Sequence, residues 1–72
     1  MIVYKPIGSD TIINIPELQS AVALDKNGLY YISFIMIDGS SMEWDFNSEE
    51  ERDKELQIVF DLQIALQSTV SR

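Results

Sequence analysis

Residues 25–51 of the chain, DKNGLYYISFIMIDGSSMEWDFNSEEE, decide the fold, because two predicted strands, their turns and a helix start follow one another there. The Asn-Gly pair at 27–28 tolerates the positive φ that a tight hairpin turn requires. Segment 29–37 is apolar on both of its alternating faces, which is typical of a strand covered on both sides. Asp-Gly at 38–39 predicts a second turn, so segments 29–37 and 42–46 should pair as antiparallel strands.

The strand predicted at 42–46 has one apolar and one acidic face. Met42, Trp44 and Phe46 alternate with Glu43 and Asp45, so the two carboxylates project from the same side. Paired carboxylates can act as a general acid and base. Their alternation with large apolar residues is better explained by the solvent-facing side of an antiparallel strand, and we predict no catalytic residue here.

The first part of the chain predicts two or three further strands. Segments 2–5 and 11–15 have strand composition and are separated by a turn-rich stretch at 6–10. Pro16 ends the second segment, and the apolar positions of 18–24 favour a strand that the hairpin joins to residue 29. We therefore expect an α+β fold, an antiparallel meander of four or five strands followed by one C-terminal helix.

The C-terminal helix begins at a strong start signal and carries more apolar residues than one face needs. Ser48 and Glu51 have the spacing of a capping box, and three glutamates complement the positive end of the helix dipole. At about 100° per residue, the apolar positions divide into two sets. The broad arc is Ile58, Val59, Leu62, Ala65, Leu66 and Val70, and the second row is Leu56, Phe60 and Ile64.

Length and composition exclude most small-domain chemistry. Seventy-two residues form one domain, 1–72, whose stability alone should be marginal, and no cysteine or histidine supplies a disulfide, a thiolate or the commonest metal ligand. Consecutive acids at 49–51 with Asp53 point in different directions around a helix, so we predict no metal site and no cofactor. With no signal peptide and no spanning helix, we expect a cytoplasmic protein with no membrane contact and no enzymatic activity.

A net charge of −7 with five scattered bases disfavours nucleic acid, because phosphate binding needs clustered Lys and Arg. An open sheet rich in aromatic residues could still stack single-stranded bases. Core packing is favoured for these side chains, since the charges predicted beside them are acidic. The aromatic set is Tyr30, Tyr31, Phe34, Trp44 and Phe46.

Several short patterns between residues 7 and 51 resemble the small flagellar swarming-motility proteins. They are Ile7-Gly8, Ile13-Asn14-Ile15-Pro16-Glu17-Leu18, Ile35-Met36-Ile37-Asp38-Gly39 and Ser48-Glu49-Glu50. The resemblance implies the same order of short strands, a glycine turn and a helix, and a bacterial or phage-like character. The two-sided helix after Leu56 departs from that pattern, so the resemblance implies no function.

The unmatched apolar surface predicts a protein-interaction module that forms a homodimer through its C-terminal helix, its uncovered sheet face, or both, because one helix covers only one face of a small sheet. A compact monomer whose N-terminal strands cover the second face is the alternative. Two other functions remain open: a single-stranded nucleic-acid binder, and an acidic inhibitor whose carboxylates imitate phosphates to block a basic partner. The interface candidates are Leu56, Phe60, Ile64, Tyr30, Ile32 and Phe34.

Overall fold

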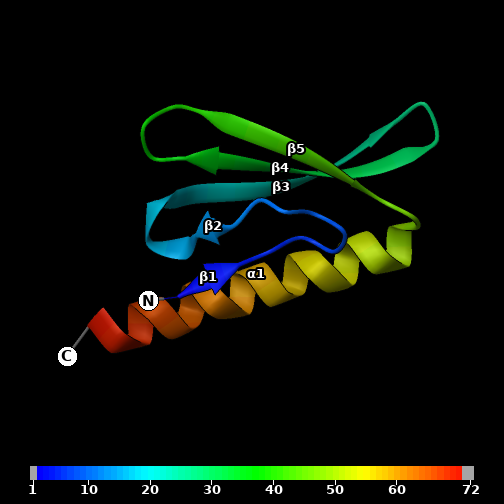
Figure 1. Cartoon of the computed structure of the whole chain (residues 1–72). Coiled ribbons are helices and arrows are strands. Elements are labelled where there is room, and N and C mark those ends of the chain that lie inside the picture. The colour runs from blue at the N-terminus through cyan, green and yellow to red at the C-terminus, as the bar shows by residue number, and fades with distance from the viewer. Residues whose placement is uncertain (1, 71–72) are drawn as a thin grey trace.

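The computed structural model describes the backbone of residues 2–70 and the side chains of residues 2–67. It has the expected α+β architecture, in which a three-stranded antiparallel meander lies above one long C-terminal helix (Figure 1). A small N-terminal hairpin lies on the helix side of the sheet. The elements are β1 (Val3–Tyr4), β2 (Ile13–Asn14), the 3₁₀-helix η1 (Ile15–Glu17), β3 (Leu18–Lys26), β4 (Leu29–Met36), β5 (Ser41–Phe46) and α1 (Glu49–Val70).

Both predicted turns of the meander are confirmed. Asn27 and Gly28 have φ values of 53° and 78°, so the pair closes the β3–β4 hairpin with Lys26 opposite Leu29. In the second turn, the Asp38 carboxylate accepts hydrogen bonds from the hydroxyl and the amide of Ser40, at 2.6 and 2.9 Å. These bonds hold the pKa of the Asp38 carboxyl below its ordinary value.

The N-terminal strands are much shorter than predicted. Only Val3–Tyr4 and Ile13–Asn14 pair, and they form a separate two-stranded sheet rather than an extension of the meander. Pro6 lies two residues after the end of β1, and its carbonyl oxygen accepts a turn bond from the Ser9 amide at 3.0 Å, while Pro16 lies in the first turn of η1. Proline cannot donate to a strand ladder, so both segments stop early.

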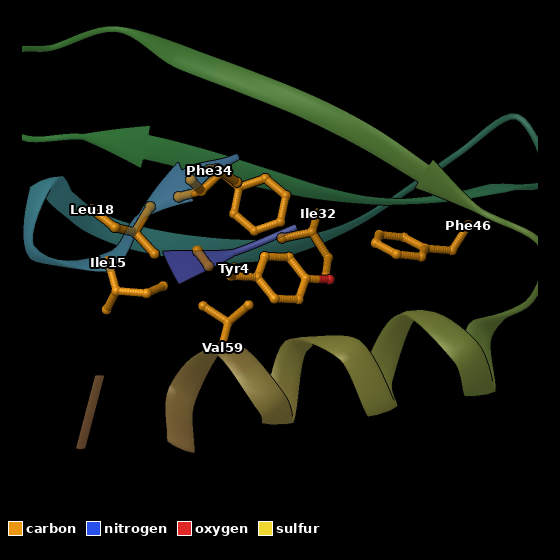
Figure 2. Close-up of a cluster of buried hydrophobic side chains, with 9 residues drawn as sticks. Tyr4, Ile15, Leu18, Ile32, Phe34, Phe46 and Val59 are labelled. Atoms are coloured by element: carbon orange, nitrogen blue, oxygen red, sulfur yellow. The ribbon is translucent and has the colours of Figure 1, made fainter. Parts of the chain in front are cut away.

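The core lies between the helix side of the meander and α1. Ile32 and Phe34 of β4 and Val59 of α1 are completely buried. Tyr4 inserts between sheet and helix, with its ring centroid 5.9 Å from that of Phe34 (Figure 2). Helix α1 contacts all three meander strands as well as η1, so one helix and the N-terminal segment cover one face of the sheet.

The start of α1 has the Ser48 cap that the sequence predicts, but the return bond of the capping box goes to the residue before the cap. The Glu51 amide donates to the Ser48 hydroxyl at 3.1 Å, and the Glu51 carboxylate accepts from the Asn47 amide, also at 3.1 Å. The helix therefore begins at the residue that the sequence predicts. Only the side of the helix that faces the core can differ from expectation.

The orientation of α1 corrects part of the predicted broad arc. Val59 is buried and Leu62 and Leu66 pack against the core, but Ile58 is 38% exposed and Leu56 packs against the core instead. The buried line of the helix runs through two charged residues, Arg52 and Glu55, so the side that faces the core differs from the predicted broad arc. Ala65 is also exposed, and the side chain of Val70 lies outside the described residues.

Candidate interaction surface

The strand register divides the meander into two faces of different burial. Phe34 lies opposite Ala21 and Met42, and Ile32 lies opposite Ala23 and Trp44, so these side chains share the face toward α1. The intervening residues project from the other side of the sheet. Figure 1 shows no element of residues 2–70 that covers this side. We call this side the outer face; its residues are Ser20, Val22, Leu24, Lys26, Leu29, Tyr31, Ser33, Ile35, Ser41, Glu43 and Asp45.

The centre of the outer face is apolar and open to solvent. Val22, Leu24 and Leu29 are 43%, 36% and 45% exposed. Tyr31 and Ile35 lie beside them on β4 and are half-buried by their neighbours. Aliphatic side chains of this size are stabilised by about 1.5–3 kcal/mol each when removed from water, so this surface gains from being covered.

The charges of the outer face lie at its two opposite edges. Among these residues, Lys26 of β3 is the single base, while Glu43 and Asp45 of β5 are the acids. Strand β4 lies between them and contributes no charge to this face. The outer face therefore has one basic corner, one acidic edge and a neutral centre.

A second exposed apolar patch is the row on α1. Phe60 is 37% exposed and Ile64 is 59% exposed, while Leu56 is partly buried against the core. The exposed side of the helix beside this row is polar, since Gln57 donates to the Asp61 carboxylate at 3.0 Å. The helix row is therefore narrower than the outer face and has an acid beside it.

Two of the predicted interface residues are wrong. Ile32 and Phe34 have 0% exposure because they face α1, so no second molecule reaches them in the folded chain. Their predicted alternation was right, but the face they share is the one that the helix covers. Tyr30 is half-buried on the same side, with the Arg52 guanidinium 5.5 Å from its ring centroid.

Arg52 ties the start of α1 to the end of β3. Its side chain is nearly buried, forms an ion pair with Asp25, and donates to the Leu24 carbonyl oxygen at 3.1 Å and to the Asp53 carboxylate at 2.8 Å. These carboxylates raise the pKa of the guanidinium, which is charged in any case. One feature of the sequence is consistent with this role: Arg52 is the first base in the acid-rich start of the helix.

Tyr4 and Glu55 form the other buried polar contact of α1. The Tyr4 hydroxyl donates to the Glu55 carboxylate at 2.7 Å, and both side chains are more than 90% buried. Burial and this carboxylate together raise the pKa of Tyr4 well above its ordinary value of 10.0. Within residues 2–67, no buried polar side-chain atom lacks a hydrogen-bond partner, so this pair is satisfied and offers no free reactive group.

The aromatic residues that were considered as a base-stacking platform do not form one in the structure. Tyr30, Phe34, Trp44 and Phe46 all face the helix side of the sheet, and the Trp44 indole donates to the Ile7 carbonyl oxygen at 3.1 Å. Tyr31 is the single aromatic residue of the outer face. A row of rings open to solvent, which stacking of successive bases requires, does not form on either side.

An open hollow lies at the β4–β5 turn, lined by Glu17, Met36, Ile37, Asp38 and Ser40. The Asp38 carboxylate is engaged by Ser40, and Glu17 is exposed. Across the part of the chain that the structure describes, no three Asp or Glu side chains come together to hold a metal ion. That part also contains no helix long and apolar enough to cross a membrane.

No family model, curated protein or solved structure matches the chain. The resemblance to swarming-motility proteins therefore stays a prediction.

Proposed function

We propose that this protein is a non-enzymatic interaction module that forms a homodimer through the outer face of its sheet. The observation that carries the proposal is the burial difference between the two sides of β4. Ile32 and Phe34 are fully buried on one side, whereas Leu29 of β4 itself and Val22 and Leu24 of the neighbouring β3 remain exposed on the other. A second sheet packed at about 10 Å would cover the exposed set, as in a β-sandwich.

A second copy of the chain is the partner that fits this face best. Homodimers with two-fold symmetry are the commonest assembly, and their interfaces are apolar at the centre and polar at the rim. The outer face has that composition, and Tyr31 supplies the aromatic anchor that such interfaces favour. Most acids of the chain lie elsewhere, so two copies can meet here despite a charge of −7 each.

The outer face is preferred to the helix row for the same electrostatic reason. Two helices that met through Phe60 and Ile64 would bring two copies of Asp61 close to the contact, together with the acidic first half of each helix. Like charges at an interface oppose association. The helix row is tested beside the outer face in the experiment below.

The experiment is sedimentation equilibrium at several concentrations for the natural chain and for Val22→Asp. We expect the natural chain to approach twice its 8.2 kDa mass, and Val22→Asp to raise the dimer dissociation constant at least about tenfold, since each carboxylate must lose water without a partner. Circular dichroism should show that the variant remains folded, because Val22 is exposed in the single chain.

Two matched controls place the same change elsewhere. Ile12→Asp puts a carboxylate on an exposed isoleucine before β2, and Ile64→Asp puts one on the helix row. Neither should alter the dissociation constant appreciably. A natural chain that stays at monomer mass up to high micromolar concentration would refute the proposal, and a loss of assembly confined to Ile64→Asp would move the interface to the helix.

The other candidate functions have less support. Single-stranded nucleic-acid binding loses its aromatic platform, as described above. The acidic inhibitor remains a prediction from net charge alone, and the cytoplasmic location remains a prediction of the sequence.

A further inference from the structure

The charges at the edges of the outer face determine how two copies would be oriented, if they associate as proposed above. When two identical sheets stack face to face, the two-fold axis lies between them, in the plane of the interface. It can run along the central strand or across the strands. The two choices bring different edges of the sheet together, so the edge charges distinguish them.

An axis across the strands places each strand over its own copy. It would then run close to one of the cross-strand rows of the outer face, such as Val22–Ser33–Glu43 or Leu24–Tyr31–Asp45. Each of these two rows ends in a carboxylate of β5. That carboxylate would face the β5 acids of the other copy. Four carboxylates would gather at one edge, which opposes association.

An axis along β4 gives the opposite result. The residues that then face their own copies are Leu29, Tyr31, Ser33 and Ile35, and none of them is charged. The same rotation places β3 of one copy over β5 of the other, since these strands flank β4 on opposite sides. The edge of one copy that carries Lys26 therefore meets the edge of the other copy that carries Glu43 and Asp45.

Lys26 and Asp45 are the charges that this arrangement brings together. Leu24 pairs with Tyr31, which pairs with Asp45, so Lys26 lies two residues beyond the Asp45 row. Two residues along a strand span about 7 Å, which the four-carbon side chain of lysine can bridge. Both side chains are exposed in the single chain, so they can pair without breaking an internal core contact.

We infer that the two-fold axis of the homodimer runs along β4, so that Lys26 of each copy forms an ion pair with Asp45 of the other. This inference rests on the proposed function and adds the orientation of the partner and the residues that set it. The uncharged residues of β4 supply the apolar contact along the axis, and the two symmetry-related ion pairs fix the rotation of one sheet over the other.

Charge reversal tests this arrangement, because specific pairing and net charge predict opposite results for Asp45→Lys. Lys26→Glu changes the net charge from −7 to −9, and Asp45→Lys changes it from −7 to −5. If only net repulsion mattered, Lys26→Glu would weaken the dimer and Asp45→Lys would strengthen it. With an ion pair across the axis, each single reversal should raise the dissociation constant roughly tenfold.

The double variant Lys26→Glu/Asp45→Lys restores opposite charges and should return the dissociation constant to near the natural value. A mixture of the two single variants should likewise form a heterodimer tighter than either homodimer. Lys5→Glu and Asp61→Lys are the matched controls, since they make the same charge changes at exposed residues outside the outer face. The differences should shrink in high salt.

A dimer that is strengthened by Asp45→Lys, or a double variant weaker than both single variants, would overturn the inferred axis. The proposed function would still stand in that case if Val22→Asp dissociates the dimer. A natural chain that never dimerises would overturn both.

Discussion

The two faces of β4 have nearly the same apolar character and very different surroundings. Ile32 and Phe34 project toward α1 and are fully buried, whereas Tyr31, Ser33 and Ile35 alternate with them and are only half-buried. Alternation of apolar residues on both sides indicates that a strand is covered twice. It does not indicate whether the same chain or another molecule provides the second cover, and that difference separates folding from assembly in this protein.

The largest expected effect is on the inner face, which is the side of the sheet that packs against α1 and contains Ile32 and Phe34. Phe34→Ala should lower the free energy of unfolding by about 3–5 kcal/mol, because it leaves a cavity between sheet and helix. In a domain of this size that is most of the stability, so the variant should be largely unfolded without denaturant. Urea unfolding followed by far-UV circular dichroism, at a concentration too low for association, measures it.

Tyr31→Ala is the matched control on the outer face of the same strand. At that low concentration it should cost less than about 1 kcal/mol, because Tyr31 is only partly buried and does not lie in the core between sheet and helix. Equal losses for Phe34→Ala and Tyr31→Ala would show that the two faces are equivalent in the single chain.

The next effect concerns the tyrosine beneath the inner face. Tyr4→Phe should cost about 1–3 kcal/mol at neutral pH, because the buried Glu55 carboxylate loses its donor. Tyr31→Phe, on the outer face, should cost little. Urea midpoints at pH 7 compare the two variants.

The same tyrosine gives stability a defined dependence on alkaline pH. In the folded chain the pKa of Tyr4 lies above its ordinary value of 10.0, so between these two values the folded state holds a proton that the unfolded state has released. Stability is therefore full below about pH 10 and falls as pH rises beyond it. The fall should be shallower in Tyr4→Phe than in Tyr31→Phe; equal slopes would contradict the assignment.

A smaller loss is expected at the start of the helix that covers the inner face. Ser48→Ala removes the acceptor for the Glu51 amide and should cost roughly 0.5–2 kcal/mol. Because Ser48 lies away from the outer face, the dimer dissociation constant should stay unchanged. An unchanged urea midpoint would mean that Asn47, rather than Ser48, caps the helix.

The smallest expected signal is binding of single-stranded DNA. The outer face offers one ring, Tyr31, and one base, Lys26, so fluorescence anisotropy with a labelled oligonucleotide at physiological salt should detect no micromolar affinity. Binding that weakened steeply with added salt would make the outer face a nucleic-acid surface instead of a protein interface.

Local signals in the sequence were sufficient for the meander and the helix start. The turns at Asn27-Gly28 and Asp38-Gly39 and the cap at Ser48 depend on neighbouring residues, so they were predicted correctly. Which side of the sheet packs against the helix was harder to predict. Ile32 and Phe34 were assigned to an interface although they face α1. Hydrophobic alternation gives the parity of a strand but not the side on which a distant helix packs.

The charged residues of the helix show the same limit. The sequence does not indicate that Arg52 and Glu55 are buried, because their partners Leu24 and Tyr4 lie far away along the chain. A buried charge becomes acceptable only when a distant segment pairs with it. The orientation of α1 could therefore be predicted only approximately from its apolar residues.

The hydrogen bond between Tyr4 and Glu55 also has a consequence for the time at which the chain can fold. Its partners are 51 residues apart, whereas the meander is built from strands adjacent in sequence. Contacts between neighbouring strands close short loops and form early, and a contact of this span carries a larger entropic barrier. During synthesis Tyr4 is made long before Glu55, so the N-terminal hairpin must wait, with its apolar side chains uncovered, until the helix has emerged. Docking of that hairpin should then be the last step, and the one most exposed to misassembly.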